Sequence, residues 1–125
     1  MQEQTLKKLI FIYNANAGKH NALFDAAQKI LSPTTYDCNL CDITFGLFKE
    51  NKTWKKYRKA SITKMEFLHK DEYTKMYASK FGYKITFPSV LAETDYALEV
   101  FINTDELNSL EKAEDLMQLI EKRLN

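Results

Sequence analysis

Phe87-Pro88-Ser89-Val90-Leu91 is the segment from which the fold is best predicted. It reads as a buried strand with a proline near its start, where a missing backbone N–H is tolerated in a sheet. The turn residues of Thr94–Ala97 follow, and a second strand-like segment runs from Leu98 to Ile102. Two such segments joined by a short turn form a β-hairpin. We therefore predict an antiparallel hairpin at this end of the chain.

Toward the N-terminus, Leu9–Tyr13 is an apolar run without alternation, which is typical of a strand covered on both faces. Asn21 is a good N-cap for a helix whose apolar residues, from Leu23 to Leu31, recur at helical spacing until Ser32-Pro33 ends it. A further strand is expected over 62–68. A helix bearing Tyr73, Met76 and Tyr77 should follow it.

The region between these elements predicts two short helices, one starting near Cys38 and broken around Gly46, the other capped by Thr53. The last helix is expected after a cap at Asn108 or Ser109, with Glu111 closing a capping box with Asn108. Its expected buried face consists of Leu110, Ala113, Leu116, Met117, Ile120 and Leu124.

Without the short helices at about residues 32–60, the order is β-α-β-α-β-β-α. The first half favours parallel strands joined by right-handed crossovers, and the hairpin adds an antiparallel edge. This is the element order of the thioredoxin fold, and the Phe87-Pro88 segment resembles the place where thioredoxin-like proteins begin a strand with a cis proline. The resemblance implies one thioredoxin-like α/β domain over residues 1–125, with a short helical insertion carrying Cys38 and Cys41, and a cis bond before Pro88.

Three features also look like a family of small, uncharacterised bacterial proteins, some of which carry an automatic GTPase label. They are the Tyr36-x-Cys38-x-x-Cys41 motif, the His69-x-Asp71 pair and the segment after Pro88. A phosphate-binding loop would need Gly-x-x-x-x-Gly-Lys-Ser/Thr. Gly18-Lys19 fits this pattern, but Tyr13 replaces the first glycine and His20 the hydroxyl residue. We therefore expect no nucleotide hydrolysis.

Composition excludes several classes of function. The chain has 125 residues, 45% hydrophobic and 28% charged, with a net charge of +1, which is ordinary for one globular domain. Such a balance gives no electrostatic case for nucleic acid or an anionic membrane. The basic residues of 52–64 around Trp54 and Tyr57 are explained by the wet face of a helix. No segment has about 20 apolar residues, and no signal-peptide core is seen near the N-terminus, so a cytoplasmic protein is expected.

The Cys38-Asn39-Leu40-Cys41 segment is the strongest candidate for chemistry. At a helix N-terminus, Cys38 would be a stabilised thiolate and nucleophile, with Cys41 one turn on as the resolving thiol. The neighbouring acids Asp37 and Asp42 oppose this by raising the thiol pKa. In thioredoxin-like enzymes the pair directly follows the first strand, whereas here it comes after the first predicted helix. Pro88 would lie beside the thiols only if the insertion folds back over the end of that strand.

Two alternatives stay open. Cys38 and Cys41 supply half of a tetrahedral zinc site, which His69 and an aspartate, or both His69 and His20, could complete. Asp71 could orient the imidazole of His69. His69 and Asp71 could equally cap the following helix. The third hypothesis is a non-catalytic scaffold with buried structural thiols. It would bind a protein partner through the aromatic residues of the insertion, which are Tyr36, Phe45, Phe48, Trp54 and Tyr57.

Overall fold

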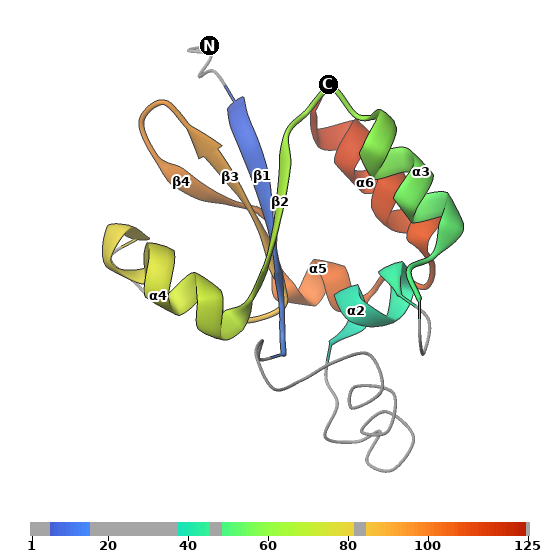
Figure 1. Ribbon diagram of the computed structural model, residues 1–125, viewed down its shortest axis with the longest axis horizontal. Coiled ribbons are helices and arrows are strands. Elements are labelled where there is room, and N and C mark those ends of the chain that lie inside the picture. The colour runs from blue at the N-terminus through green and yellow to red at the C-terminus, as the bar shows by residue number, and fades with distance from the viewer. Residues whose placement is uncertain (1–5, 16–37, 46–48, 82–84, 125) are drawn as a thin grey trace.

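The computed structural model of the protein describes residues 6–15, 38–45, 49–81 and 85–124. Four strands form one mixed sheet in the order β2-β1-β3-β4 (Figure 1). They are β1 (Leu6–Tyr13), β2 (Met65–His69), β3 (Ser89–Thr94) and β4 (Leu98–Ile102). β1 is parallel to β2 and antiparallel to β3, and β3 is antiparallel to β4. The predicted parallel pair and the C-terminal hairpin are both confirmed.

The central strand β1 carries apolar side chains to both faces of the sheet. Leu9 and Phe11 belong to one buried cluster, and Ile10 and Ile12 belong to another, because successive side chains of a strand point to opposite faces. All four are fully buried. Each such side chain contributes about 1.5–3 kcal/mol of hydrophobic stabilisation. The unbroken apolar run is therefore a strand covered on both faces, as predicted.

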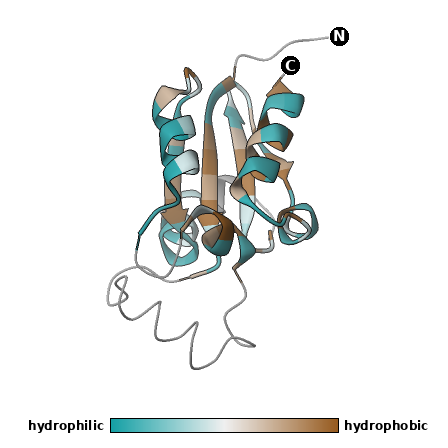
Figure 2. Cartoon of the chain, turned by 90° about the vertical axis from the view of Figure 1, so that its right-hand side faces the viewer, coloured by the Kyte–Doolittle hydropathy of each residue, from teal (hydrophilic) through white to brown (hydrophobic). Residues whose placement is uncertain are grey.

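Helices cover both faces of the sheet. α3 (Lys52–Ala60) and α6 (Ala113–Leu124) lie side by side over one face, and α4 (Lys70–Phe81) covers the other (Figure 1). Two short helices, α2 (Asn39–Thr44) and α5 (Thr104–Asn108), lie together at one end of the sheet. Figure 2 shows the apolar strands between helices whose outer surfaces are hydrophilic. None of the described helices combines the length and the apolar composition that a membrane span requires.

The strand predicted over 62–68 is shorter at its start and extends to His69. Ile62 is fully exposed, and the first residue paired with β1 is Met65, opposite Leu9. A tight turn precedes the strand, in which the N–H of Thr63 donates to Ser61 Oγ at 3.1 Å. This turn holds Ile62 away from the sheet, which local apolar patterning did not reveal.

Two predicted helix caps are wrong. Asn51, not Thr53, caps α3, with its side chain accepting the N–H of Trp54 at 2.9 Å. The C-terminal segment contains two helices, and neither begins at Asn108 or Ser109. Asn103 caps α5 in a capping box with Glu106, and α6 starts at Ala113. Asn108 is the last residue of α5 and not the cap of α6, so the expected capping box with Glu111 has no helix to begin. The N–H of Glu111 instead donates to the side chain of Asp115.

The Phe87–Pro88 bond is cis, as expected, and β3 begins one residue later, at Ser89. The helix predicted after Asn21, together with Gly18-Lys19, His20 and Asp37, lies outside the described residues.

Candidate dithiol site

Cys38 lies where α2 begins and where β1 ends. It is the N-cap of α2, and its Sγ accepts the backbone N–H of Cys41 at 3.3 Å. A second backbone N–H, that of Asn14, also points at Cys38 Sγ from 3.3 Å. Asn14 directly follows the last residue of β1. Two amide donors from different elements therefore converge on one sulfur atom.

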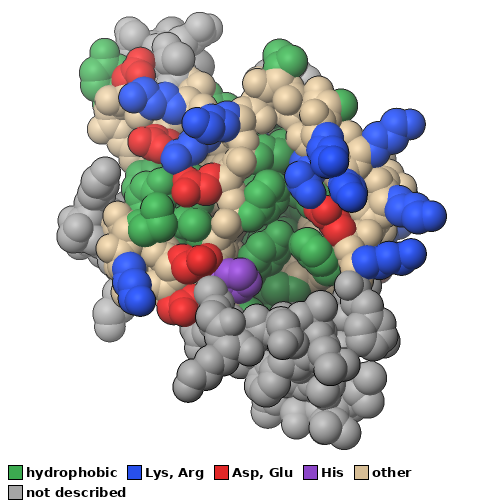
Figure 3. All heavy atoms as spheres, viewed as in Figure 1, with side chains coloured by type: hydrophobic (Ala, Val, Ile, Leu, Met, Phe, Trp, Pro, Cys, Tyr) green, Lys and Arg blue, Asp and Glu red, His purple; other side chains and the backbone are tan. Residues whose placement is uncertain are grey.

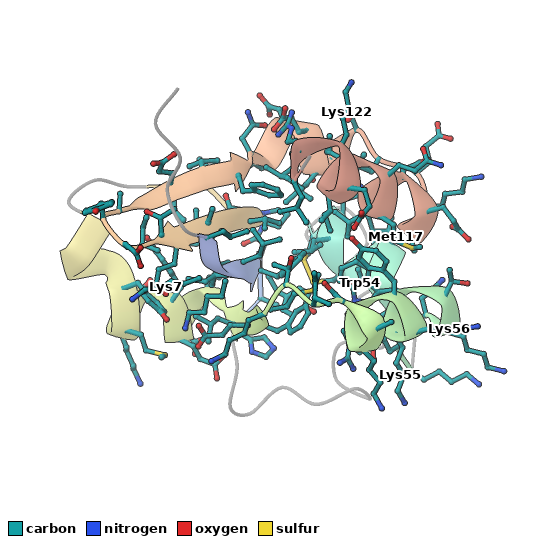
Figure 4. All side chains as sticks on the ribbon, turned by 90° about the horizontal axis from the view of Figure 1, so that it is seen from above. Lys7, Trp54, Lys55, Lys56, Met117 and Lys122 are labelled. Carbon is teal, nitrogen blue, oxygen red and sulfur yellow. A yellow bond between two sulfur atoms is a disulfide. The ribbon has the colours of Figure 1, made fainter. Side chains whose placement is uncertain are left out.

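The two cysteines form a disulfide within one helical turn. The S–S distance is 2.21 Å and the Cα atoms are 5.2 Å apart. Figure 4 shows this bond in yellow, inside the molecule. Cys38 is 1% exposed and Cys41 is 8% exposed, and both belong to the same buried cluster as Trp54. The pair is therefore packed into the core rather than displayed on the surface.

α2 is fastened to the C-terminal part of the chain by Asn39. Its side-chain Nδ2 donates to the carbonyl of Leu107 at 2.6 Å and to that of Leu110 at 2.8 Å. Leu40, the next residue, is fully buried, while Asp42 is exposed. The short helix is thus held by one bidentate polar contact and by core packing, since six residues alone would not form a stable helix.

The cysteine pair lies closer to the first strand than its place in the sequence suggested. The intervening residues separate it from β1 along the chain, yet Cys38 Sγ contacts Asn14 at the end of that strand. Pro88 lies at the same end of the sheet, because Ser89 is paired with Ile12. Pro88 was expected beside the thiols only if the inserted segment folds back over the end of the first strand. In the described residues α2 does fold back in this way.

His69 and Asp71 make local contacts at the start of α4. Glu72 Oε1 accepts the backbone N–H of His69 at 2.8 Å and lies 3.0 Å from its Nδ1, and Asp71 Oδ1 accepts the N–H of Glu72. The hydrogen bonds from the backbone and imidazole of His69 lower the pKa of Glu72. The helix-capping interpretation of His69 and Asp71 therefore describes this region, with Glu72 as the partner that sequence reasoning missed.

The described residues contain no group of three or more His, Cys, Asp or Glu side chains placed to hold a metal ion. Cys38 and Cys41 are consequently not joined there by His69. A zinc site built on this set gains no support from the part of the chain that the structure describes.

Lys70, the first residue of α4, joins that helix to the loop after β1. Its backbone N–H donates to the carbonyl of Ala15 at 3.1 Å, and its Nζ donates to Asn14 Oδ1 at 3.3 Å. Sequence reasoning gave Lys70 no role. The available signal was its position directly after a strand that runs parallel to β1, since parallel strands bring their carboxyl ends together.

Some aromatic residues of the predicted insertion lie in the core, whereas its lysines lie on the surface. Trp54 is fully buried and points inward from α3, whereas Lys55 and Lys56 of the same helix point to solvent (Figure 4). Basic side chains gather over α3 in Figure 3. Phe45 is 38% exposed and packs edge-on against Tyr13, with ring centroids 6.3 Å apart. Tyr36 and Phe48 lie outside the described residues.

Comparison of the chain with family models, with curated proteins and with solved structures gave no match. No family or homologue is thereby identified, and the resemblance to the small bacterial family gains no support.

Proposed function

We propose that the protein is a thiol–disulfide exchange protein of thioredoxin-like architecture, with Cys38 as the nucleophile and Cys41 as the resolving thiol. The observation that carries the proposal is the convergence of the Asn14 and Cys41 N–H groups on Cys38 Sγ. On reduction the same donors would face a thiolate. Hydrogen bonds to the charged form of an acid favour that form, so the pKa of Cys38 should be lowered.

The arrangement around the pair supports this architecture. The sheet order β2-β1-β3-β4, with β1 and β2 parallel and the C-terminal hairpin antiparallel, agrees with the element order of the thioredoxin fold. The cysteine pair opens a helix at the end of β1, and Pro88 precedes β3 at the same end of the sheet. A cytoplasmic setting, where thiols are kept reduced, would suit a pair that cycles between two states.

The exchange would proceed in two displacement steps. The Cys38 thiolate attacks one sulfur of a partner disulfide, forming a mixed disulfide and expelling the other partner sulfur as a thiolate. Cys41 Sγ, after losing its proton to that thiolate or to solvent, then attacks Cys38 Sγ and expels the second partner sulfur. Two electrons pass from the Cys38–Cys41 pair to the partner. A dithiol reductant would return the pair to its reduced state by the reverse steps.

The burial of both sulfur atoms places a condition on this chemistry. With exposed fractions of 1% and 8%, neither sulfur presents the open face that a protein disulfide needs. Exchange therefore requires a local opening at α2. Local openings of short segments cost less free energy than global unfolding.

Alkylation of the reduced protein tests the proposal. Cys41→Ser leaves Cys38 as the only thiol, and its rate of reaction with iodoacetamide is followed against pH by mass spectrometry. We expect a midpoint below the ordinary cysteine pKa of about 8.5. Burial lowers the rate at every pH but leaves the midpoint readable. Cys38→Ser, which leaves only Cys41, is the matched control, and its midpoint should lie higher. A Cys38 midpoint at or above about 8.5 would reject the proposal.

A further inference from the structure

The loop that supplies a hydrogen-bond donor to Cys38 is itself held by Lys70. The Asn14 N–H points at Cys38 Sγ from 3.3 Å, and the Asn14 side chain accepts a hydrogen bond from Lys70 Nζ at 3.3 Å. The next carbonyl, that of Ala15, accepts the backbone N–H of Lys70. One residue at the start of α4 therefore contacts Asn14 and Ala15, the two described residues that follow β1, by two hydrogen bonds.

We propose that Lys70 is a positioning residue that controls the reactivity of Cys38 through Asn14. The inference rests on the proposed thiol function of the same site. Lys70 makes no described contact with either sulfur, so it acts by holding the Asn14 amide in line with Cys38 Sγ.

The physical reason is that a single hydrogen-bond donor stabilises an anion only when it is kept in place. An amide in an unrestrained loop would lose conformational entropy to make the contact, which reduces the net stabilisation. Lys70 is itself restrained, since its carbonyl accepts Thr74 Oγ1 at 2.9 Å within α4. Through Lys70, α4 thus holds the segment after β1 in place, and with it the Asn14 N–H that donates to Cys38 Sγ.

The titratable groups next to these residues include Tyr13 on β1, His69 on β2, Asp42 on α2, and Asp71 and Glu72 on α4. Glu50 and Arg58 act electrostatically on Tyr13. His69 and Glu72 are bonded to each other. Among the groups of β2 and α4, Lys70 is the one with a described hydrogen bond to the residue that donates to Cys38.

The test compares the alkylation profile of Cys38 in six chains, all with Cys41→Ser. They are the parent, its Lys70→Met, Lys70→Arg, Asn14→Ala and Lys55→Met variants, and the double variant Asn14→Ala/Lys70→Met. Asn14→Ala keeps the backbone N–H and removes the side-chain link to Lys70. Lys55→Met removes an exposed lysine of α3 and so controls for the change of net charge. Far-ultraviolet circular dichroism verifies that each variant is folded.

We expect Lys70→Met and Asn14→Ala each to lower the alkylation rate at pH 7 about threefold to tenfold, equal to a rise of about half to one unit in the midpoint. Lys70→Arg should restore most of the parent rate, and Lys55→Met should leave it unchanged. The double variant Asn14→Ala/Lys70→Met should be no slower than either single variant, because both changes break one link.

The outcomes separate this inference from the proposed function. A parent midpoint at or above about 8.5 rejects the function itself. A low parent midpoint that Lys70→Met and Asn14→Ala leave unmoved overturns only the role of Lys70. Additive effects in the double variant, or an equal shift in Lys55→Met, would also overturn it, because they indicate independent or long-range electrostatic action.

Discussion

The amide N–H of Asn14 lies 3.3 Å from Cys38 Sγ, although 24 positions separate the two residues in the sequence. The contact brings the end of β1 and the start of α2 next to each other. The sequence places the cysteine pair in an inserted segment. In the structure the pair lies at the end of the sheet where β1 ends and β3 begins. The same contact supplies one of the two donors on which the proposed thiolate depends.

Reduction of the disulfide should change the fluorescence of Trp54, the only tryptophan of the chain. Trp54 is fully buried and shares one core cluster with Cys38 and Cys41. Disulfides quench nearby indoles by accepting an electron from the excited state, so emission should rise when a dithiol reductant is added. The Cys38→Ser/Cys41→Ser variant is the control and should not respond to the reductant. An equal response in that variant would show that the change does not come from this disulfide.

Asn39→Ala should destabilise the protein and loosen α2. The substitution leaves the carbonyls of Leu107 and Leu110 without the Asn39 amide, and losing the partner of a partly buried polar group costs about 1–3 kcal/mol. Urea unfolding measures the loss. Reduction of the Cys38–Cys41 disulfide under native conditions should also become faster. Lys55→Ala changes an exposed residue of α3 and should stay within about 0.5 kcal/mol. Equal effects of the two changes would contradict the anchoring role of Asn39.

Asn51→Ala should cost about 1 kcal/mol of stability, because the Asn51 side chain caps α3 by accepting the N–H of Trp54. Thr53→Ala alters a good capping residue that lies inside the helix and is exposed, so it should be close to neutral. Thermal unfolding of the two variants compares the cap seen in the structure with the cap expected from the sequence. A larger loss in Thr53→Ala would show that α3 begins later than described.

The Glu106–Arg123 ion pair should contribute stability that depends on pH. The two side chains form a bidentate contact that joins α5 to α6, and the Arg123 guanidinium, followed by the Asn103 N–H, lowers the pKa of Glu106 to about 2. Both side chains are about one-third exposed, at 34% and 35%. Solvent screening therefore limits the expected contribution to about 1 kcal/mol.

Since the pKa of Glu106 is lower in the folded state than the ordinary value of about 4.3, its contribution is present above that value and is lost as the pH falls toward about 2. Urea unfolding of the parent and of Arg123→Met should thus differ by about 1 kcal/mol at pH 7 and converge at acid pH. Lys122→Met, an exposed neighbour, is the control for lost charge. A difference that persists unchanged at pH 2 would assign the effect to packing of the arginine chain, or to its bond with the Phe101 carbonyl, instead of to Glu106.

Local patterning was sufficient for much of the fold. The unbroken apolar run ending at Tyr13 specified a strand buried on both faces, and the 87–102 segment specified a hairpin. The start of a helix at Cys38 was also predictable. These features depend on residues that are neighbours in sequence, whose backbone preferences and periodicity report directly on strand, turn and helix.

Helix caps were less predictable, because several good capping residues lie close together. Asn51 and Thr53 compete at α3, and Asn103, Asn108 and Ser109 compete after β4. Their intrinsic preferences differ by fractions of a kcal/mol. The burial of Trp54 and of Leu107 fixes where each helix can start, and that burial is a property of the assembled core.

The sequence alone specified the four strands, the two apolar faces of β1 and the presence of a cysteine pair at a helix start. Three features became apparent only in the folded chain. α2 returns to the end of β1, the Asn14 N–H donates to Cys38 Sγ, and Lys70 Nζ donates to the Asn14 side chain. A residue's local preferences set its backbone angles and the face it buries, whereas a contact across many residues depends on the whole path of the chain and on which buried surfaces close together.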